Sequence, residues 1–389
     1  MNISGTHNCY GCGVCALACS KNIIIIRQND SGFYEPYIPD PRLCSDCGLC
    51  VEVCSYCHDK LSTDSSNILS YAAWSKDNAV RRKCSSGGVG FEVGRSLIDQ
   101  GYQVLGCRYN VVENRAEHYV SSTVEELIPS IGSKYIQSYT VDGLKQIDRR
   151  KKYLITGTPC QIDSFRRYIR KFRCEDNFVL MDFFCHGVPS MLLWKKYVTW
   201  AERQVGKLIY VSWRNKFTGW HDSWSMAIDG NMHGEPVDWH DSYNVLIREK
   251  KSFLNSKRTQ GDFFYNLFLN DSCLGKACYK KCKFKGARSS ADIRIGDLWG
   301  TLYQDNEVGV SAVLAMTQKG KAVLEKCNCS FIKHPFEVVA EGQLKQSPQL
   351  NYLRFCALCL LRSPLPMKTC VWLYSILKRV NCKIARLKF

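Results

Sequence analysis

Two runs of closely spaced cysteines carry the clearest chemistry in this sequence. Each run has the spacing C-x2-C-x2-C-x3-C. The cysteines are Cys9, Cys12, Cys15 and Cys19 in the first run and Cys44, Cys47, Cys50 and Cys54 in the second. A cubane of iron and sulfide needs four thiolates around one small volume, and a tight loop with a cysteine at every third residue can supply three of them. The spacing therefore predicts iron–sulfur chemistry.

The repeat also predicts how the eight thiolates divide between two 4Fe-4S clusters. In two-cluster bacterial ferredoxins, the fourth cysteine of each run binds the cluster of the other run. We therefore expect one cluster on Cys9, Cys12, Cys15 and Cys54, and another on Cys44, Cys47, Cys50 and Cys19. Gly13 and Gly48 are expected to leave room beside them. Zinc is the alternative, although zinc sites more often separate two C-x2-C pairs by a longer loop.

The composition places these thiols in a reducing compartment. The chain has 389 residues and 23 cysteines, and no apolar run approaches the length of a membrane-spanning helix, which is roughly 18 residues. Residues 1–20 lack the basic and apolar segments of a secretion signal. Clustered cysteines in a large reduced protein indicate metal or redox chemistry rather than disulfides. We therefore expect a cytoplasmic protein.

Strands and helices alternate after the cysteine-rich segment, which is typical of an α/β domain with a largely parallel sheet. Strands are predicted at 22–27, 103–109, 153–156 and 178–184, and a helix near 89–100. The predicted organisation is a two-cluster ferredoxin domain at 1–60, a Ser-rich linker at 61–82, an α/β flavin-binding domain at 83–335 and a basic tail at 336–389. Ligands of such α/β domains bind at the carboxyl ends of the strands.

Six further motifs follow one another along the larger domain. They are C-S-S-G-G at 84–88, S-K-Y-I-Q-S at 133–138, G-T-P-C-Q-I at 157–162, C-H-G-V-P-S at 185–190, W-R-N-K at 213–216 with G-W at 219–220, and G-D-L-W-G at 296–300. This order resembles the coenzyme F420 hydrogenase/dehydrogenase beta-subunit family, in its form with a fused N-terminal ferredoxin. The resemblance covers about residues 1–300 and implies an iron–sulfur flavoprotein, usually with FAD.

A flavin agrees with the chemistry of the cysteines, because clusters move single electrons whereas organic reductions usually need two. Backbone N–H groups of a glycine-rich loop before a helix can hold its phosphates. Two loops meet that description: Ser85, Ser86, Gly87 and Gly88, and Gly157, Thr158, Pro159 and Cys160. Asp297 is expected to orient the flavin or the substrate, with a turn aspartate as the alternative.

His186 and Lys134 are the candidate catalytic side chains. His186 could donate a proton beside the flavin, because histidine titrates near neutral pH. A structural histidine at the end of a strand is the alternative. Lys134 is expected near the flavin or a substrate carboxylate, and the alternative is an exposed lysine.

Three later cysteines suggest a third 4Fe-4S cluster. Cys273, Cys278 and Cys282 resemble a family cysteine pattern that precedes the glycine-aspartate motif, but they are one ligand short. The fold could supply the fourth from Cys84, Cys160 or Cys185.

The positive charge is concentrated in the tail. The net charge is +17, and nine basic residues follow Glu341 with no acidic residue among them. This uneven distribution argues against a nucleic-acid partner. Residues 378–389 interleave basic and apolar side chains, which leaves two alternatives open: a terminal helix packed on the body, or peripheral contact with the inner face of an anionic membrane.

These observations predict an oxidoreductase that passes electrons between two 4Fe-4S clusters and FAD, to or from an organic substrate. The substrate could be a deazaflavin or an intermediate of polysaccharide biosynthesis, and the other reactant a redox partner protein or a small electron donor. A non-catalytic electron-transfer subunit that feeds a partner enzyme is the alternative, and a structural zinc protein is a further one.

Overall fold

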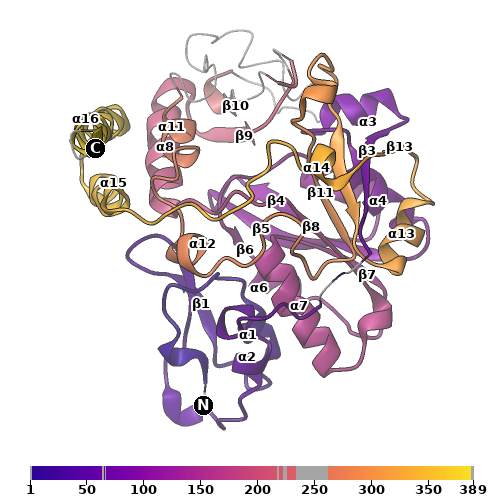
Figure 1. Cartoon of the computed structure of the whole chain (residues 1–389). Coiled ribbons are helices and arrows are strands. Elements are labelled where there is room, and N and C mark those ends of the chain that lie inside the picture. Colours follow the sequence, from indigo (N-terminus) through magenta and orange to yellow (C-terminus); the bar gives the residue numbers. More distant parts are fainter. Residues whose placement is uncertain are drawn as a thin grey trace.

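The computed structural model describes residues 2–63, 65, 67–216, 219–221, 226–233 and 262–386. The cysteine-rich N-terminal segment forms the lower part of the molecule in Figure 1. A large sheet lies above it between helices, and the last two helices lie at one edge. The architecture is a mixed α and β fold.

The N-terminal segment contains a short helix within each cysteine run, with a hairpin between the helices. Its elements are α1 (Val14–Ala18), the antiparallel strands β1 (Ile25–Gln28) and β2 (Tyr34–Tyr37), and α2 (Leu49–Glu52). Gly13 and Gly48 precede the helices with φ angles of 74° and 75°, a left-handed conformation that glycine adopts without steric cost. The two runs therefore share the same local backbone.

A nine-stranded sheet forms the centre of the molecule, in the order β13-β3-β12-β11-β8-β7-β4-β5-β6. In chain order these strands are β3 (Leu69–Ser75), β4 (Gln103–Asn110), β5 (Arg115–Ser121), β6 (Ser138–Tyr139), β7 (Tyr153–Thr156), β8 (Phe178–Phe183), β11 (Ile293–Asp297), β12 (Ser311–Ala315) and β13 (Cys329–Lys333). Strands β4, β7, β8 and β11 run parallel, as do β5 and β6, and the other neighbours are antiparallel. The expected largely parallel sheet is thus a mixed one.

The expected linker at 61–82 contains part of this sheet. Residues 69–75 form β3, hydrogen-bonded to both β12 and β13, and α3 (Asn78–Lys83) follows it. Ala72 and Ala73 are fully buried in the strand. The small and hydroxyl-bearing residues of this strand resemble a linker in composition, and only the pairing with two neighbours reveals its place.

The central strands are buried on both faces, because their alternating residues enter two different apolar clusters. On β7, Leu154 packs with α4 (Val89–Ile98), whereas Tyr153 and Ile155 pack with α7 (Pro159–Lys171). Strands with both faces buried read as continuous apolar runs, which is why 153–156 and 178–184 stood out in the sequence. The smaller helices of this region are α5 (Val124–Leu127), α6 (Val141–Leu144), α12 (Lys276–Lys280), α13 (Gln318–Leu324) and α14 (Phe336–Val339).

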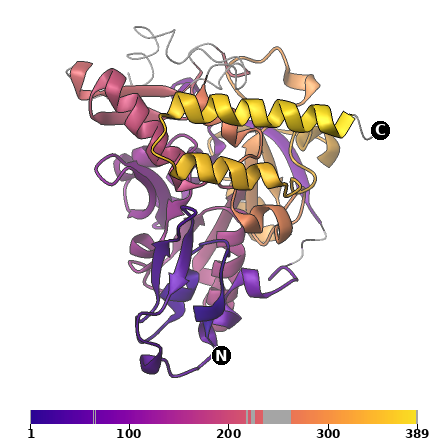
Figure 2. The same ribbon diagram turned by 90° about the vertical axis from the view of Figure 1, so that its left-hand side faces the viewer.

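A separate apolar core lies beside the sheet. It joins α8 (Met191–Val205), the paired strands β9 (Leu208–Ser212) and β10 (Ala227–Gly230), and α11 (Phe263–Phe268) to the C-terminal helices α15 (Tyr352–Arg362) and α16 (Met367–Arg386). Helices α15 and α16 lie side by side across the outside of this core (Figure 2).

Among the described residues, no helix is both long enough and apolar enough to cross a membrane.

Candidate functional site

Four of the predicted cluster ligands surround one small cavity in the N-terminal segment. Cys9, Cys12, Cys15 and Cys54 all line it, together with Tyr10 and Tyr56. Three come from the first run and the fourth from the end of the second, which is the crossed arrangement that the spacing predicts. Burial raises the pKa of the Cys9 thiol to about 12. Such thiols ionise at neutral pH only if a metal replaces their protons.

The other predicted ligands lie on the outer side of this segment. Cys50 interacts electrostatically with Cys44 and Cys47, and it shares an apolar cluster with Cys19. The Asn2 side chain donates a hydrogen bond to Cys44 Sγ at 3.4 Å. Cys47 is exposed and Cys44 is partly buried. This second group of cysteines is therefore closer to solvent than the first.

In the described part of the chain, no three His, Cys, Asp or Glu side chains are close enough to hold a single metal ion. The four sulfurs of a tetrahedral zinc site lie about 3.8 Å apart, given Zn–S distances of about 2.3 Å.

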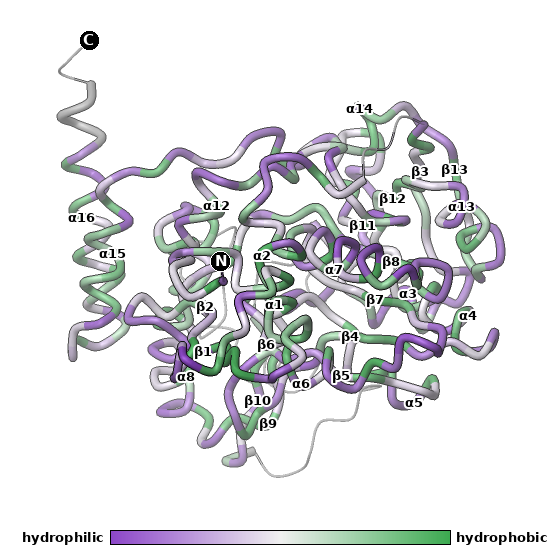
Figure 3. Tube along the Cα trace, turned by 90° about the horizontal axis from the view of Figure 1, so that it is seen from below, coloured by the Kyte–Doolittle hydropathy of each residue, from purple (hydrophilic) through white to green (hydrophobic). Residues whose placement is uncertain are grey.

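Hydrogen bonds from one buried side chain and the close approach of a glycine hold the N-terminal segment against the sheet. The Gln137 amide accepts a hydrogen bond from Tyr34 N at 2.9 Å and donates one to Tyr10 O at 3.1 Å. A Cβ atom on Gly13 would lie 2.2 Å from Thr140 Oγ1, so this glycine is needed for docking as well as for its φ angle. Figure 3 shows α1 and α2 beside α6 and α7.

A third group of cysteines lies where the N-terminal segment meets the sheet. Cys160 begins α7, Cys185 follows β8, and Cys278 and Cys282 lie in and just after α12. Cys160 interacts electrostatically with Cys185, Cys278 and Cys12, and Cys282 interacts with both Cys185 and Cys278. Strands β7 and β8 are adjacent and parallel, so their carboxyl ends bring Cys160 and Cys185 to the same edge.

This group corrects the predicted ligands of the third cluster. Cys273 is fully buried in the α8 core, where its electrostatic neighbours are Arg354 and Asp271 rather than the other cysteines. Cys84 lies with Lys216, Glu92 and Lys134. The spacing of the three later cysteines could not reveal this, because it does not show that Cys273 is buried inside the α8 core while Cys278 is only partly buried against it.

Tyr10 lies between the inner N-terminal cysteines and the third group. It lines the cavity of Cys9 and Cys54. Its hydroxyl donates a hydrogen bond to the carbonyl of Lys281, beside Cys282. Its ring packs against Phe284 at 5.9 Å. Burial and the neighbouring Cys160, Cys282 and Cys278 raise its pKa. The two cysteine groups are therefore neighbours across one aromatic side chain.

The loop Gly157–Cys160 uses two of its backbone N–H groups in hydrogen bonds within the protein. Gly157 N donates to Met181 O at 3.2 Å, Thr158 N donates to Gln161 Oε1 at 2.8 Å, and Pro159 has no N–H. Thr158 Oγ1 lies 3.2 Å from Cys160 Sγ. The loop presents Cys160 to the third group, and its expected role in holding flavin phosphates stays a prediction.

The loop Ser85–Gly88 lies between β3 and β12, close to the carboxyl ends of β3 and β11. Gly87 N donates to Ser311 Oγ at 3.0 Å, and Gly87 O accepts from Ser75 N at 2.7 Å. A Cβ atom on Gly87 would lie 2.4 Å from Ala73 O, so only glycine fits here. Gly88 starts α4 with a φ of 87°.

Basic side chains surround this loop. Lys216 Nζ donates to the carbonyls of Arg81 and Ser86, and burial lowers its pKa to about 7. Arg214 is buried, lies 3.5 Å from Asp297 Oδ1, and stacks on Trp299 with 4.6 Å between the guanidinium carbon and the ring centre.

Asp297 is the acidic residue that interacts with Arg214 in this region. Besides Arg214, its Oδ1 accepts a hydrogen bond from Trp220 Nε1 at 3.1 Å. The expectation that Asp297 orients a ligand stays a prediction. Its neighbours Arg214 and Lys216 received no role from the sequence, although the W-R-N-K motif at 213–216 marked them.

Lys134 has a supporting position. Its amine donates to the carbonyls of Pro129, Ser130 and Ile131 at 3.1, 2.9 and 2.9 Å, and burial lowers its pKa to about 8. The preceding residue in the turn, Ser133, donates from its N–H to Ser85 Oγ at 2.9 Å. Because all three of its donor sites have acceptors, Lys134 holds this turn beside the Ser85–Gly88 loop rather than reaching a substrate.

His186 lies at the rim of the third cysteine group. Its Nε2 is 2.7 Å from Asp271 Oδ1, and its ring packs against Phe268 at 4.9 Å. Lys285 Nζ donates to the carbonyls of both Cys185 and His186, at 2.6 and 2.9 Å. Lys285 therefore places a positive charge next to this group, a position that the sequence alone did not indicate.

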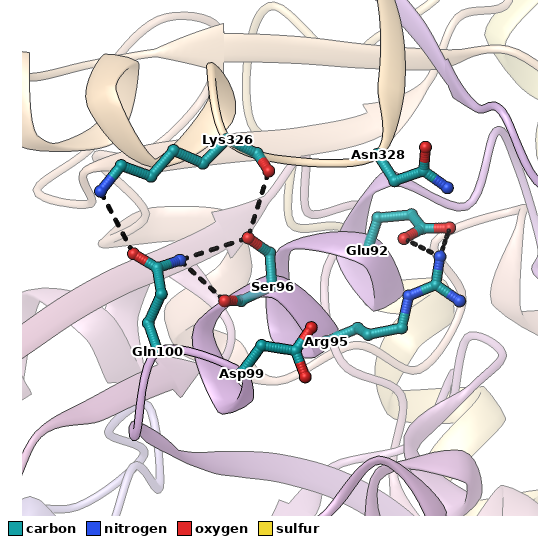
Figure 4. A pocket seen from close by; sticks show the side chains of 7 residues that line it. All are labelled: Glu92, Arg95, Ser96, Asp99, Gln100, Lys326 and Asn328. Carbon is teal, nitrogen blue, oxygen red and sulfur yellow. Dashed lines mark hydrogen bonds and ion pairs between the residues drawn. The ribbon is translucent and has the colours of Figure 1, made fainter.

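A polar depression at the far end of α4 is unrelated to these groups (Figure 4). It is lined by Glu92, Arg95, Ser96, Asp99, Gln100, Lys326 and Asn328. Arg95 pairs with Glu92 at 2.7 Å, and Lys326 donates to Gln100 at 3.3 Å. Most of its side chains pair with one another, and none of the predicted site residues lines it.

Comparison with known proteins gives matches of three kinds. Residues 150–332 match a family model for the C-terminal part of the beta subunit of coenzyme F420 hydrogenase/dehydrogenase. A curated protein from Methanococcus voltae, named coenzyme F420 hydrogenase subunit beta, is 38% identical over 72 residues. That match spans 17% of this chain and 26% of the relative, about a quarter of its length.

Among solved structures, the chain is similar to a chain in a structure of the F420-reducing [NiFe] hydrogenase complex from Methanosarcina barkeri. It has 17% sequence identity and a TM-score of 0.45, and the match covers 80% of this chain and 90% of that one.

Proposed function

Because residues 150–332 belong to the coenzyme F420 hydrogenase/dehydrogenase beta-subunit family, we propose that this chain is an iron–sulfur flavoenzyme. In this proposal it holds three 4Fe-4S clusters and FAD, and it transfers electrons to or from an organic substrate. The observation that carries the proposal is the pair of cysteine groups on either side of Tyr10. Clusters carry single electrons, and bound FAD would supply their conversion to a pair.

The inner N-terminal cysteines fit a cluster by their chemistry and placement. Cys9, Cys12, Cys15 and Cys54 are four thiols around one cavity, which is the donor set that a cubane needs. The outer group, Cys19, Cys44, Cys47 and Cys50, would hold the second cluster, and its greater exposure suits entry of electrons from a donor. In our proposal the three groups therefore form a series from the exposed outer end to the sheet.

The third cluster would be held by Cys160, Cys185, Cys278 and Cys282. Burial raises the pKa of Cys278 to about 12 and raises that of Cys185 and Cys160 as well. A group of buried thiols with no bound metal would stay protonated, whereas iron stabilises the thiolates. The Lys285 ammonium, at the carbonyl of Cys185, would offset part of the cluster's negative charge.

The edge of the sheet near Ser85–Gly88 offers what FAD would need. Arg214 is buried and Lys216 is partly buried, and desolvation lowers the pKa of Lys216 more than the nearby Cys84 and Asp297 raise it, so further negative charge would stabilise its ammonium. A pyrophosphate would supply that charge, and the N-terminus of α4 would add its dipole. Lys134 would hold the turn beneath the loop, and Trp299 would offer a ring face.

The His186–Asp271 pair supports a proton-holding role in our proposal. Asp271 fixes the imidazole through Nε2 at 2.7 Å, and histidine is the side chain that most often transfers protons in enzymes. His186 would thus hold the proton that accompanies transfer of an electron pair. It follows Cys185 directly, so it lies next to the last cluster of the series.

The substrate class follows from the relatives only as a proposal. The Methanococcus voltae protein is named for coenzyme F420, a deazaflavin, and a deazaflavin would exchange an electron pair with FAD as a hydride equivalent. An intermediate of polysaccharide biosynthesis, which the sequence also predicts as a possible substrate, is the second candidate. That named relative is also a hydrogenase subunit, so electron delivery to a partner enzyme is the competing function.

The first test counts metal in protein purified without oxygen. We expect about twelve iron and twelve acid-labile sulfides per chain, with one releasable FAD. Cys278→Ser should retain about eight iron, whereas Cys273→Ser, which alters a buried cysteine outside the group, should retain about twelve. About eight iron in the unaltered protein would remove the third cluster, and zinc without iron would overturn the whole proposal.

A second test separates the enzyme from the electron-transfer subunit. The reduced protein is mixed anaerobically with F420, with no other protein present. Oxidation of the flavin and clusters together with reduction of F420 would support a catalytic chain that uses a deazaflavin. Reoxidation only after addition of a partner protein would support the competing function.

A further inference from the structure

The C-terminal hairpin of α15 and α16 carries an apolar outer face that the redox proposal does not use. Its inner residues, among them Leu358, Leu361 and Tyr374, are buried against α8 and α11. Its outer residues include Tyr352, Phe355, Trp372, Ile376 and Val380, which are 57%, 69%, 60%, 38% and 49% exposed. The hairpin is thus apolar on both sides, but only its inner side packs against the rest of the protein.

The exposed residues recur at helical spacing. Trp372, Ile376 and Val380 are four residues apart on α16, so they form one stripe. A second stripe lies on α15, where the exposed residues Tyr352, Phe355 and Cys359 are three and four residues apart. Helices α15 and α16 lie side by side on the outside of the molecule in Figure 2. The two stripes therefore belong to the same outer layer, which faces away from α8.

Basic residues accompany this face, and acidic ones do not. Lys368 and Arg379 are exposed on α16, and Arg362 is exposed at the end of α15. No Asp or Glu occurs in the sequence after Glu341. A protein partner would usually meet a surface with charges of both signs and few lysines. Aromatic and aliphatic side chains among cations, with no anions, match an anionic lipid surface instead.

We propose that the α15–α16 hairpin is a docking surface for an anionic lipid bilayer. Phe355, Trp372, Ile376 and Val380 would enter the boundary between headgroups and acyl chains, and Lys368 and Arg379 would meet lipid phosphates. The helices would lie in the plane of the surface. This inference is independent of the cofactors, because none of the cysteine groups lies in the hairpin.

Vesicle co-sedimentation of the full-length, cofactor-loaded protein tests this surface. We expect binding to phosphatidylcholine vesicles that contain phosphatidylglycerol, little binding to phosphatidylcholine alone, and weaker binding as salt is raised. Lys368→Glu with Arg379→Glu should lower the binding at least about tenfold. Phe355→Ser with Trp372→Ser should lower it by a similar factor.

Matched controls keep the test specific to the hairpin. Lys145→Glu with Lys151→Glu reverses two exposed charges elsewhere, and Val112→Ser removes an apolar residue that is 74% exposed. Both should leave vesicle binding unchanged, and the iron content of every variant verifies its fold. Equal binding to neutral and anionic vesicles would overturn the proposal. It would also be overturned if the hairpin variants bound as the controls do, or if the protein bound only another protein through this face.

Discussion

Lys285 places a positive charge beside the third cysteine group, to which it contributes no thiol. Its ammonium donates to the carbonyls of Cys185 and His186 and interacts electrostatically with Cys185 and Cys278. A positive charge stabilises the more negative, reduced form of a cluster. Loss of this charge should therefore make the proposed third cluster harder to reduce.

Lys285→Gln is expected to lower the midpoint potential of the third cluster by about 50–100 mV, given one charge at about 7–10 Å in a medium of effective dielectric constant about 20. Redox titration followed by electron paramagnetic resonance measures the shift. Lys285→Arg should restore most of the potential, and Lys280→Gln, at an exposed lysine of the same basic run, should not change it. An unchanged potential in Lys285→Gln would contradict the assignment.

Lys216 predicts a pH dependence of anion binding at the proposed flavin site. Burial lowers its pKa from 10.5 to about 7, and Cys84, Asp297, Arg81 and Arg214 are the charged or titratable groups around it. A bound pyrophosphate would raise that pKa, so binding takes up a proton above pH 7. ADP affinity for flavin-free protein should be constant below about pH 7 and weaken above it, by up to tenfold per pH unit.

Calorimetric titration in buffers of different ionisation enthalpy measures both the affinity and the proton uptake. Lys216→Arg should keep the affinity and lose the pH dependence, because arginine stays charged. Lys216→Met should lose both. A pH dependence that survives in Lys216→Arg would assign the proton to another group.

At the scale of elements, the two cysteine runs have the same backbone but different surroundings. Gly13 and Gly48 both have positive φ angles before a short helix. A Cβ atom on Gly13 would collide with Thr140 Oγ1 at 2.2 Å, whereas a Cβ atom on Gly48 would meet nothing within 4 Å. The two cysteine runs therefore repeat in sequence but differ in the contacts that surround their glycines.

Gly48→Ala should cost about 1 kcal/mol of unfolding free energy, from the left-handed backbone alone. Gly13→Ala carries the same strain and also displaces the N-terminal segment from Thr140, so its cost should be clearly larger and should include loss of iron. Thermal unfolding and iron content of the two variants give the comparison. Equal effects would show that docking at Thr140 contributes nothing.

At the scale of the molecule, the proposed electron path depends on how the N-terminal segment sits against the sheet. Gln137 is buried and links Tyr34 N and Tyr10 O across this interface. Tyr10 in turn lies between the inner cysteine cavity and the third cysteine group. A single amide thus helps to hold two cysteine groups in place.

Gln137→Ala leaves one buried N–H and one buried carbonyl without partners, so it should lower the unfolding free energy by about 2–4 kcal/mol. Hydrogen exchange at residues 8–15 should also become faster. Gln146→Ala, which alters an exposed glutamine just after α6, should change stability by less than about 0.5 kcal/mol. Unchanged exchange in Gln137→Ala would show that other contacts hold the interface.

The sequence by itself determined what depends on local spacing. The C-x2-C-x2-C-x3-C runs predict thiols around a common point, and the structure places four of them around one cavity. The apolar runs at 153–156 and 178–184 predicted β7 and β8 to within one residue, because strands buried on both faces are mostly apolar. The six ordered motifs indicated the family that residues 150–332 match.

The tertiary structure decided what depends on segments that are far apart in the chain. Cys160, Cys185 and Cys278 come together because β7 and β8 are parallel neighbours and α12 lies near their carboxyl ends, whereas Cys273 is buried inside the α8 core. The place of β3 in the sheet depends on hydrogen bonds to two distant strands, which composition does not encode. The lowered pKa of Lys216 arises from burial, a property of the whole fold.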